Sequence, residues 1–190
     1  PSSAVVTTEK STTVLFEDDF NGYGSATTLK ELKSQLIANG YTTGGTMFNN
    51  THATESYSDA EALTVPQGTE MYLSTGSVPG SEDWSEYSVS ADVKFNAAPV
   101  VPEGDADGAV NSYALLVINA PSVSAGGYEF GFQYSVKHNK ETNEVTETKN
   151  IIIRRRGGTF DEVSYVSKNI FIESFDLVVG ETYSLKLVYQ

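Results

Sequence analysis

Aromatic residues recur at every second position between residues 128 and 134, and this spacing constrains the fold more than any other feature of the chain. Successive side chains of a β-strand point to opposite faces of its sheet, so Tyr128, Phe130, Phe132 and Tyr134 share one face. We expect that face to be buried. Residues 151–153 are three isoleucines that form a returning strand, so the sequence predicts a long β-hairpin from residue 128 to residue 156.

A turn at residues 142 and 143 sets the expected register of this hairpin. It places Tyr134 opposite Ile151 on the aromatic face and Glu129 opposite Arg156 on the other face. The second face carries a carboxylate, an amide and two guanidinium groups: Glu129, Gln133, Arg154 and Arg156. Such a row is equally typical of the polar surface of a ligand-binding site and of solvated cross-strand ion pairs, which contribute little to stability.

The rest of the chain also favours β-structure. Aromatic residues make up 11% of the 190 residues, with eleven Tyr and nine Phe, which suits an extended sheet better than a helical bundle. Turn signals alternate with β-prone runs, so we expect at least seven strands in one all-β, two-sheet antiparallel sandwich. The expected strands outside the hairpin cover residues 70–74, 87–95, 112–119, 164–172 and 183–189.

One short helix is predicted between residues 28 and 38. Thr28 and Glu31 have the spacing of a capping box, and leucines at positions 29, 32 and 36 form an apolar stripe. Asn39 and Gly40 provide a C-terminal stop. We expect this helix to close one end of the sandwich.

Domain organisation follows from composition and length. Residues 1–12 are rich in Ser and Thr and are interpreted as a linker or a frayed first segment, which suggests a multidomain parent. Residues 13–190 are interpreted as a single β-sandwich domain, because such domains often reach about 200 residues.

The net charge of −13 limits the classes of partner that this chain can bind. A strongly acidic protein repels phosphate backbones and anionic bilayers, so we expect no nucleic acid partner. No apolar run approaches the roughly 20 residues that span a bilayer, so we expect no membrane insertion. The chain has no cysteine, which excludes disulfides, zinc thiolate sites and thiol nucleophiles.

Five segments, taken in order, give the chain a resemblance to a known family. They are LFEDDFNGYG, DWSEYSVSADVKF, GYEFGFQYS, NIIIRRR and GETYSLKLVYQ, between residues 15 and 190. Together they resemble the concanavalin A-like, laminin-G-like sandwiches, above all the lectin-type modules of secreted bacterial glycan-active proteins.

This resemblance implies a jelly roll and a non-catalytic, carbohydrate-binding module of a secreted or cell-surface bacterial protein. Its partners would be a glycan and the neighbouring domains of the parent chain. Family members continue past the strand that ends near Tyr189 with a further strand, so the resemblance implies that this chain lacks its final strand or that another segment completes the sheet.

Sugar binding needs an exposed aromatic ring on which the apolar face of a pyranose can stack, surrounded by planar hydrogen-bonding groups. Trp84, the only tryptophan, lies in a predicted loop and is one candidate, although it is more typical of a residue that caps the core. Tyr41, Tyr57 and Tyr128 are further candidates. The polar face of the hairpin would supply the hydrogen-bonding groups.

Calcium is the most plausible cofactor, because hard cations prefer several oxygen ligands on a flexible loop. The resemblance favours Asp18 and Asp19 as ligands, since calcium commonly braces the N-terminal region of lectin-type sandwiches. The alternating acids and glycines around Asp105 and Asp107 favour a second loop. For both pairs, an ordinary acidic turn is the simpler interpretation.

The sequence contains no catalytic signature, so we expect a protein that is not an enzyme. No strand carries the paired carboxylates of a retaining glycosidase, and His52 and His138 are not near a nucleophile motif. One alternative is a structural or adhesive spacer of the same fold without glycan affinity. Another is a polysaccharide-cleaving glycoside hydrolase whose carboxylates come from separate strands.

Overall fold

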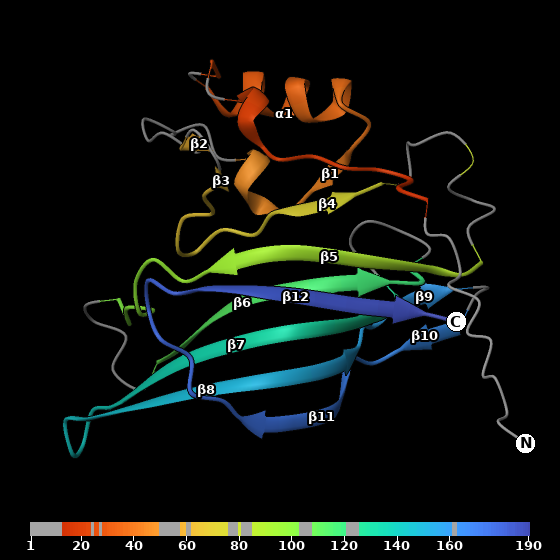
Figure 1. The fold of residues 1–190 in the computed structure, drawn as a ribbon. Helices are drawn as coiled ribbons and strands as arrows, with labels where there is room; N and C mark the ends of the chain where they lie inside the picture. Colours follow the sequence, from red (N-terminus) through yellow and green to blue (C-terminus); the bar gives the residue numbers. More distant parts are fainter. Residues whose placement is uncertain are drawn as a thin grey trace, which may run out of the picture.

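The protein is predominantly β-structure. The computed structural model describes residues 13–23, 25–26, 28–49, 58–59, 62–75, 80, 85–102, 108–120, 126–160 and 163–190. These residues form twelve strands, one α-helix and two short 3-10 helices, and every strand pair is antiparallel (Figure 1). The expected all-β class with one helix is therefore confirmed.

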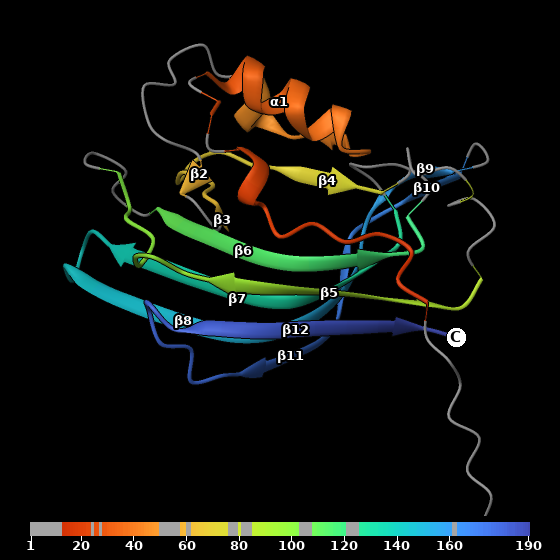
Figure 2. The same ribbon diagram turned by 45° about the horizontal axis from the view of Figure 1, so that its top comes forward.

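The largest sheet has four strands in the order β11-β8-β7-β6. Its strands are β6 (Ala109–Ile118), β7 (Tyr128–Asn139), β8 (Glu144–Arg155) and β11 (Lys168–Ser174). β5 (Tyr87–Lys94) pairs separately with β12 (Thr182–Tyr189), and Figure 2 shows this pair beside the large sheet. β9 (Gly158–Phe160) and β10 (Val163–Tyr165) form a small hairpin.

The main hydrophobic core lies between the large sheet and the β5–β12 pair. Phe132 and Tyr134 are 3% and 2% exposed, as the alternating aromatics predicted. Tyr128 is 42% exposed, so the expectation that all four aromatics are buried is wrong for this residue. It is the first residue of β7 and lies outside the core cluster, whose buried members are Phe95, Leu116, Phe132, Tyr134, Val136, Leu177 and Leu185.

The β7–β8 hairpin has the predicted faces but a different register. Tyr134 pairs with Lys149 rather than with Ile151, because four residues, 140–143, lie in the turn instead of two. The side-chain oxygen of Asn139 accepts hydrogen bonds from the backbone of Glu141 (2.9 Å) and Thr142 (3.2 Å), which stabilises the longer turn. A shift of two residues leaves every side chain on its predicted face.

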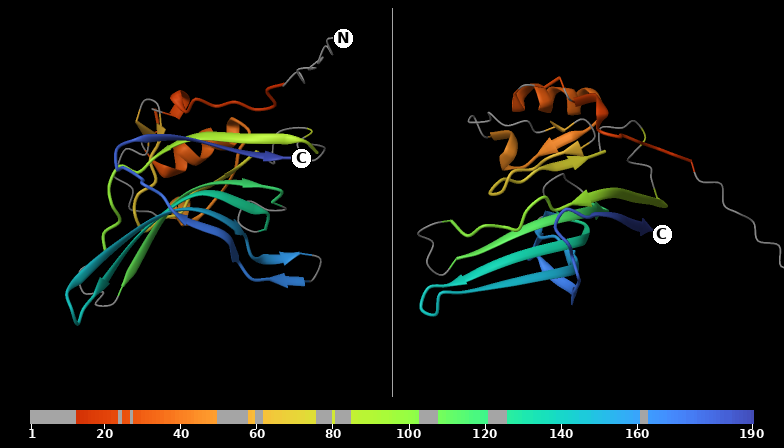
Figure 3. Two further views of the ribbon diagram at one scale, coloured as in Figure 1. Left: turned by 60° about the horizontal axis from the view of Figure 1, so that its bottom comes forward. Right: turned by 60° about the vertical axis from the view of Figure 1, so that its left-hand side comes forward.

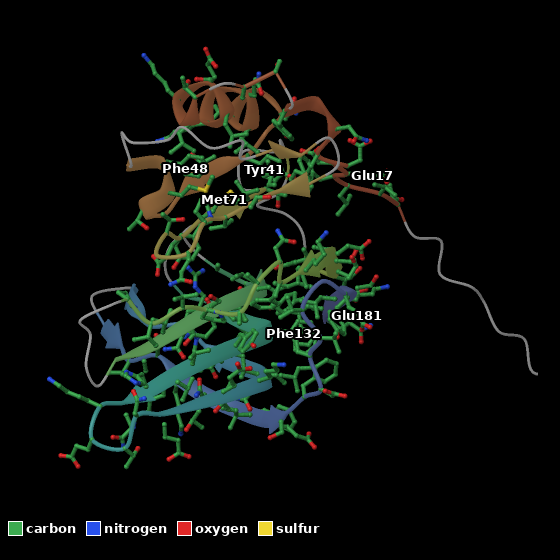
Figure 4. The ribbon with its side chains drawn as sticks, turned by 90° about the vertical axis from the view of Figure 1, so that its left-hand side faces the viewer. Glu17, Tyr41, Phe48, Met71, Phe132 and Glu181 are labelled. Carbon is green, nitrogen blue, oxygen red and sulfur yellow. The ribbon has the colours of Figure 1, made fainter. Side chains whose placement is uncertain are left out.

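A second cluster surrounds the helix. The expected capping box is present: Thr28 Oγ1 accepts from the Glu31 backbone and the Glu31 side chain accepts from the Thr28 backbone, both at 3.2 Å. The leucines of α1 (Leu29–Ala38) pack in a cluster whose buried members are Tyr23, Leu29, Leu32, Leu36, Tyr41 and Met47. Figure 4 shows Tyr41, Phe48 and Met71 beneath the helix and Phe132 in the sandwich.

The helix does not close an end of the sandwich as expected. It lies over β1 (Thr42–Gly44) and β4 (Tyr72–Ser74), which pair with each other between the helix and the sandwich (Figure 3). The remaining elements of this part are η1 (Asn21–Tyr23), η2 (Thr46–Asn49), β2 (Ser58–Asp59) and β3 (Ala62–Leu63). Among the described residues, no helix is both long and apolar enough to cross a membrane.

The single strand expected over residues 164–172 is divided in the structure. β10 ends at Tyr165 and β11 begins at Lys168, with Val166 and Ser167 between them. The Ser167 hydroxyl accepts a hydrogen bond of 2.8 Å from the Gly157 backbone, which holds the intervening turn against the end of β8. The chain therefore leaves β10 and returns along β8 as a separate edge strand.

Candidate functional site

The polar side chains predicted on the hairpin lie together on the face of the large sheet opposite the aromatic core, which we call the outer face. Residues that pair across strands share a face, so the pairing arranges them in rows. One row contains Glu129 and Arg154. The next polar row contains Tyr113, Gln133 and Asn150.

Glu129 is the centre of a buried ion-pair cluster. Its carboxylate is 2.6 Å from Arg154 Nε and 3.0 Å from Arg156 Nε. Glu129 is 3% exposed and Arg156 is 6% exposed, whereas the Arg154 side chain is 27% exposed. Burial disfavours the charge of Arg154, but the hydrogen bond and the charge of Glu129 outweigh it, so the pKa of Arg154 lies above its ordinary value.

Tyr72 of β4, in the part of the protein formed by α1, β1 and β4 (the helical part), packs against this ion-pair cluster. The Arg156 guanidinium carbon lies 5.5 Å from the centre of the Tyr72 ring, a cation–π contact between the residue that follows β8 and a residue of β4. The pKa of Tyr72 is raised, first by burial and then by the charge of Glu70, although the charge of Arg156 opposes this. Arg156 thus joins the outer face to the helical part.

Beside the ion pairs lies a hydrogen-bonded group of amides and one tyrosine. Gln133 Nε2 donates to Asn111 Oδ1 at 3.1 Å and to the Tyr113 hydroxyl at 3.2 Å. Asn150 Nδ2 donates to Gln133 Oε1 at 3.4 Å. Tyr113 is 43% exposed, and the Arg154 guanidinium carbon lies 5.2 Å from its ring centre. We call Asn111, Tyr113, Gln133, Asn150 and Arg154 the amide–tyrosine group.

The structure brings together four of the six predicted ligand residues. Glu129, Gln133, Arg154 and Arg156 share the outer face, but Glu129 and Arg156 are buried. Of the two interpretations of this row, solvated cross-strand ion pairs therefore do not describe these two residues. Tyr128 pairs with Ile118 and Arg155 and lies on the opposite face. Trp84 lies outside the described residues.

Sequence reasoning missed Asn111, Tyr113 and Asn150. The signal was present in β6, where residues 111 and 113 alternate with the inward-facing residues 112 and 114. The expected strand began at residue 112, whereas β6 begins at Ala109. Placing the longer strand beside β7 would have aligned Tyr113 with Gln133.

The candidate calcium ligands near the N-terminus take part in a turn. Asp18 Oδ1 accepts a hydrogen bond of 2.8 Å from the Phe20 backbone, and Asp18 Oδ2 accepts one from the Tyr23 hydroxyl. Burial, and then the hydrogen bond to Asp18, raises the pKa of Tyr23 to about 12. Asp19 accepts from the backbone and the side chain of Asn21, at 3.0 and 2.7 Å.

Asp18 and Asp19 therefore already have structural hydrogen-bond partners. In the described part of the chain, no group of three or more His, Cys, Asp or Glu side chains is arranged to hold a metal ion. Asp105 and Asp107 lie outside that part, so calcium binding at either pair stays a prediction.

Comparison of the chain with protein-family models, with curated proteins and with solved structures finds no match.

Proposed function

We propose that this protein is a non-catalytic, carbohydrate-binding module of a secreted or cell-surface protein, with a jelly-roll sandwich of the concanavalin A-like type. The observation that supports the proposal is the amide–tyrosine group. It combines a half-exposed aromatic ring with three amide side chains and a guanidinium group on one sheet face.

The chemistry of this group suits a sugar. Hydroxyl groups of a pyranose both donate and accept hydrogen bonds, and the amides of Asn111 and Gln133 offer both functions. Asn150 is only 7% exposed and acts by holding Gln133 through its hydrogen bond. Their mutual hydrogen bonds hold the side chains in place, which lowers the entropy that a ligand must remove on binding. Arg154 covers one face of the Tyr113 ring, so the sugar would approach the edge or the other face.

The same geometry supports a function without catalysis. Retaining glycosidases need two carboxyl groups about 5 Å apart, one of them free to attack the sugar. Glu129 is the carboxylate nearest to the amide–tyrosine group in the pairing scheme, and both of its oxygens contact arginine side chains. A carboxylate whose two oxygens both contact guanidinium groups is not free to attack a sugar.

A glycan array with the purified chain tests the proposal, and titration of the best ligand then measures its affinity. Tyr113→Ala should weaken binding about tenfold or more, because the ring contributes contact area and an ordered hydroxyl. Tyr128→Ala is the matched control, since its ring is equally exposed on the opposite face. Trp84→Ala belongs in the same series, because Trp84 remains a sequence-based candidate.

The result that contradicts the proposal is a chain that binds no glycan, or one for which the Tyr113 and Tyr128 variants bind alike. The second candidate function, a structural or adhesive spacer, would then be favoured. It has its own supporting observation: the Glu129–Arg156 pair is buried and Arg156 contacts Tyr72, so this part of the outer face holds two parts of the protein together.

We also propose that calcium stabilises the protein, as in the lectin-type modules that it resembles. Adding excess calcium should raise the midpoint of thermal unfolding, because a ligand that binds the folded state stabilises it, and chelation should reverse the effect. Replacing Asp105 and Asp107 by asparagine should abolish the rise if their loop is the site. Replacing Asp18 and Asp19 is the parallel test of the first loop. A midpoint that calcium does not change contradicts a tight site.

A further inference from the structure

The edge strand β11 exposes an apolar surface that the rest of the described protein leaves uncovered. All seven of its residues are exposed, and Ile170, Phe171 and Ile172 are 57%, 42% and 52% exposed. Within the described residues β11 pairs only with β8, and Figures 1 and 2 show it at the rim of the large sheet. An edge strand of this kind has hydrogen-bonding groups that a further strand can use.

We propose that β11 pairs with the β11 strand of a second copy of this chain, antiparallel and about a two-fold axis. The occupant is suggested by charge. Lys168 and Glu173 are the charged residues of β11, and they lie near its two ends. When the strand is paired with its own antiparallel copy, Lys168 can lie opposite the Glu173 of the second copy at both ends of the interface.

A bulge in β11 makes this register consistent with the faces of the sheet. Lys168 and Glu173 pair with Arg155 and Ile151, on the core side, although they are five positions apart. In a regular strand an odd separation places two residues on opposite faces, but here the register shifts between Asn169 and Phe171, with Ile170 as the extra residue. The two charged residues therefore face the same way.

The remaining pairs of this register also match. Asn169 and Ile172 pair with Arg154 and Ile152, so both lie on the outer side and would be opposite each other across the two-fold axis. The two central positions, Ile170 and Phe171, would also be opposite each other and would cover apolar surface on each copy. The ladder would join the two four-stranded sheets into one.

The other antiparallel registers fit less well. Centring the pairing on Phe171 would place Lys168, on the core side, opposite Ser174, on the outer side. It would also place Asn169 opposite Glu173, again from different sides. In such a register, residues that lie opposite each other point to different faces of the sheet. Their side chains therefore cannot make the cross-strand contacts that stabilise a ladder.

Charge variants test this interface while leaving the fold of an exposed strand intact. The mass of the full chain in solution is measured by sedimentation at concentrations from about 1 µM to about 1 mM. We expect a monomer–dimer equilibrium for the parent. Lys168→Glu and Glu173→Lys should each weaken dimerisation about tenfold, because each places like charges together at both ends of the interface.

A mixture of the Lys168→Glu and Glu173→Lys variants gives the most direct test of the proposed register. In a mixed pair, Glu at position 168 of one copy faces Lys at position 173 of the other, and the native Glu173 faces the native Lys168. The mixture should therefore dimerise as tightly as the parent, and so should the double variant. Lys186→Glu on β12 is the control for Lys168→Glu, because it makes the same change in net charge at another exposed position and should not alter dimerisation.

Three results would overturn the proposal. The first is a parent chain that is monomeric at about 1 mM. The second is a pair of single variants that dimerise like the parent, and the third is a mixture that dimerises no better than either variant alone. The interface does not depend on carbohydrate binding, so glycan titrations neither support nor weaken it.

Discussion

Replacing Glu129 by glutamine should lower the free energy of unfolding by about 3–5 kcal/mol, because breaking a buried ion pair from one side leaves an uncompensated charge in the interior. Glu129 neutralises two guanidinium groups, one of which is only 6% exposed. Glutamine preserves the shape of the side chain but removes its charge. Urea denaturation followed by far-UV circular dichroism gives the free energy directly.

Two further variants separate charge from packing at this site. Glu144→Gln changes an exposed residue at the start of β8 and should shift the free energy of unfolding by less than about 0.5 kcal/mol. Replacing Glu129, Arg154 and Arg156 together by methionine should cost less than Glu129→Gln alone, because no buried charge then remains. Equal stabilities of the Glu129→Gln and Glu144→Gln variants would show that the cluster is effectively solvated.

Gly131→Ala should destabilise the protein by about 3 kcal/mol, because added atoms in a packed interior force backbone shifts. A Cβ at this position would lie 2.1 Å from the Ala114 carbonyl oxygen, which is backbone and cannot rotate away. Gly131 is the fourth residue of β7 and pairs with β6 and β8 on either side. Relief of the clash would therefore require disruption of the central ladder.

Two other glycines provide controls for this variant. Gly22 has no atom within 4 Å of an added Cβ, so Gly22→Ala should be neutral or slightly stabilising. Gly68 also has free space but a φ of +77°, so Gly68→Ala measures backbone strain without a clash. If Gly131→Ala proved no worse than Gly68→Ala, the close approach of β6 and β7 would be contradicted. Unfolding in urea distinguishes the three variants.

The faces of the central hairpin could be predicted from the sequence, but its register could not. The alternation of aromatics at residues 128–134 depends only on the two-residue period of a strand. The register depends on whether two or four residues form the turn, and the side chain of Asn139 favours the longer one. A two-residue error preserves the faces, which explains why the polar cluster was predicted with incorrect cross-strand partners.

The burial of the ion pairs could not be predicted, because it depends on contacts between residues that are distant in sequence. Tyr72 contacts Arg156 from a strand 84 positions earlier, and no periodic pattern near either residue indicates that contact. The helix shows the opposite case. Its capping box and leucine stripe are local, so its limits were predicted closely, whereas its packing partners, β1 and β4, were not.

The candidate site combines these two outcomes. Gln133 and Arg154 were predicted from the hairpin alone, while Asn111 and Tyr113 come from β6, whose pairing with β7 is a tertiary feature. The buried ion pairs fix Arg154, and Arg154 in turn lies over the ring of Tyr113. The stability of the ion-pair cluster and the geometry of the amide–tyrosine group are therefore linked.

Glycan binding by the amide–tyrosine group on the outer face can be tested by titrating the isotopically labelled chain with the best array ligand and recording amide NMR spectra. We expect the largest changes in chemical shift at Asn111, Tyr113, Gln133, Asn150 and Arg154, and no change at Tyr128 on the opposite face. Shift changes confined to other parts of the chain, or none at saturating glycan, would contradict glycan binding by this group.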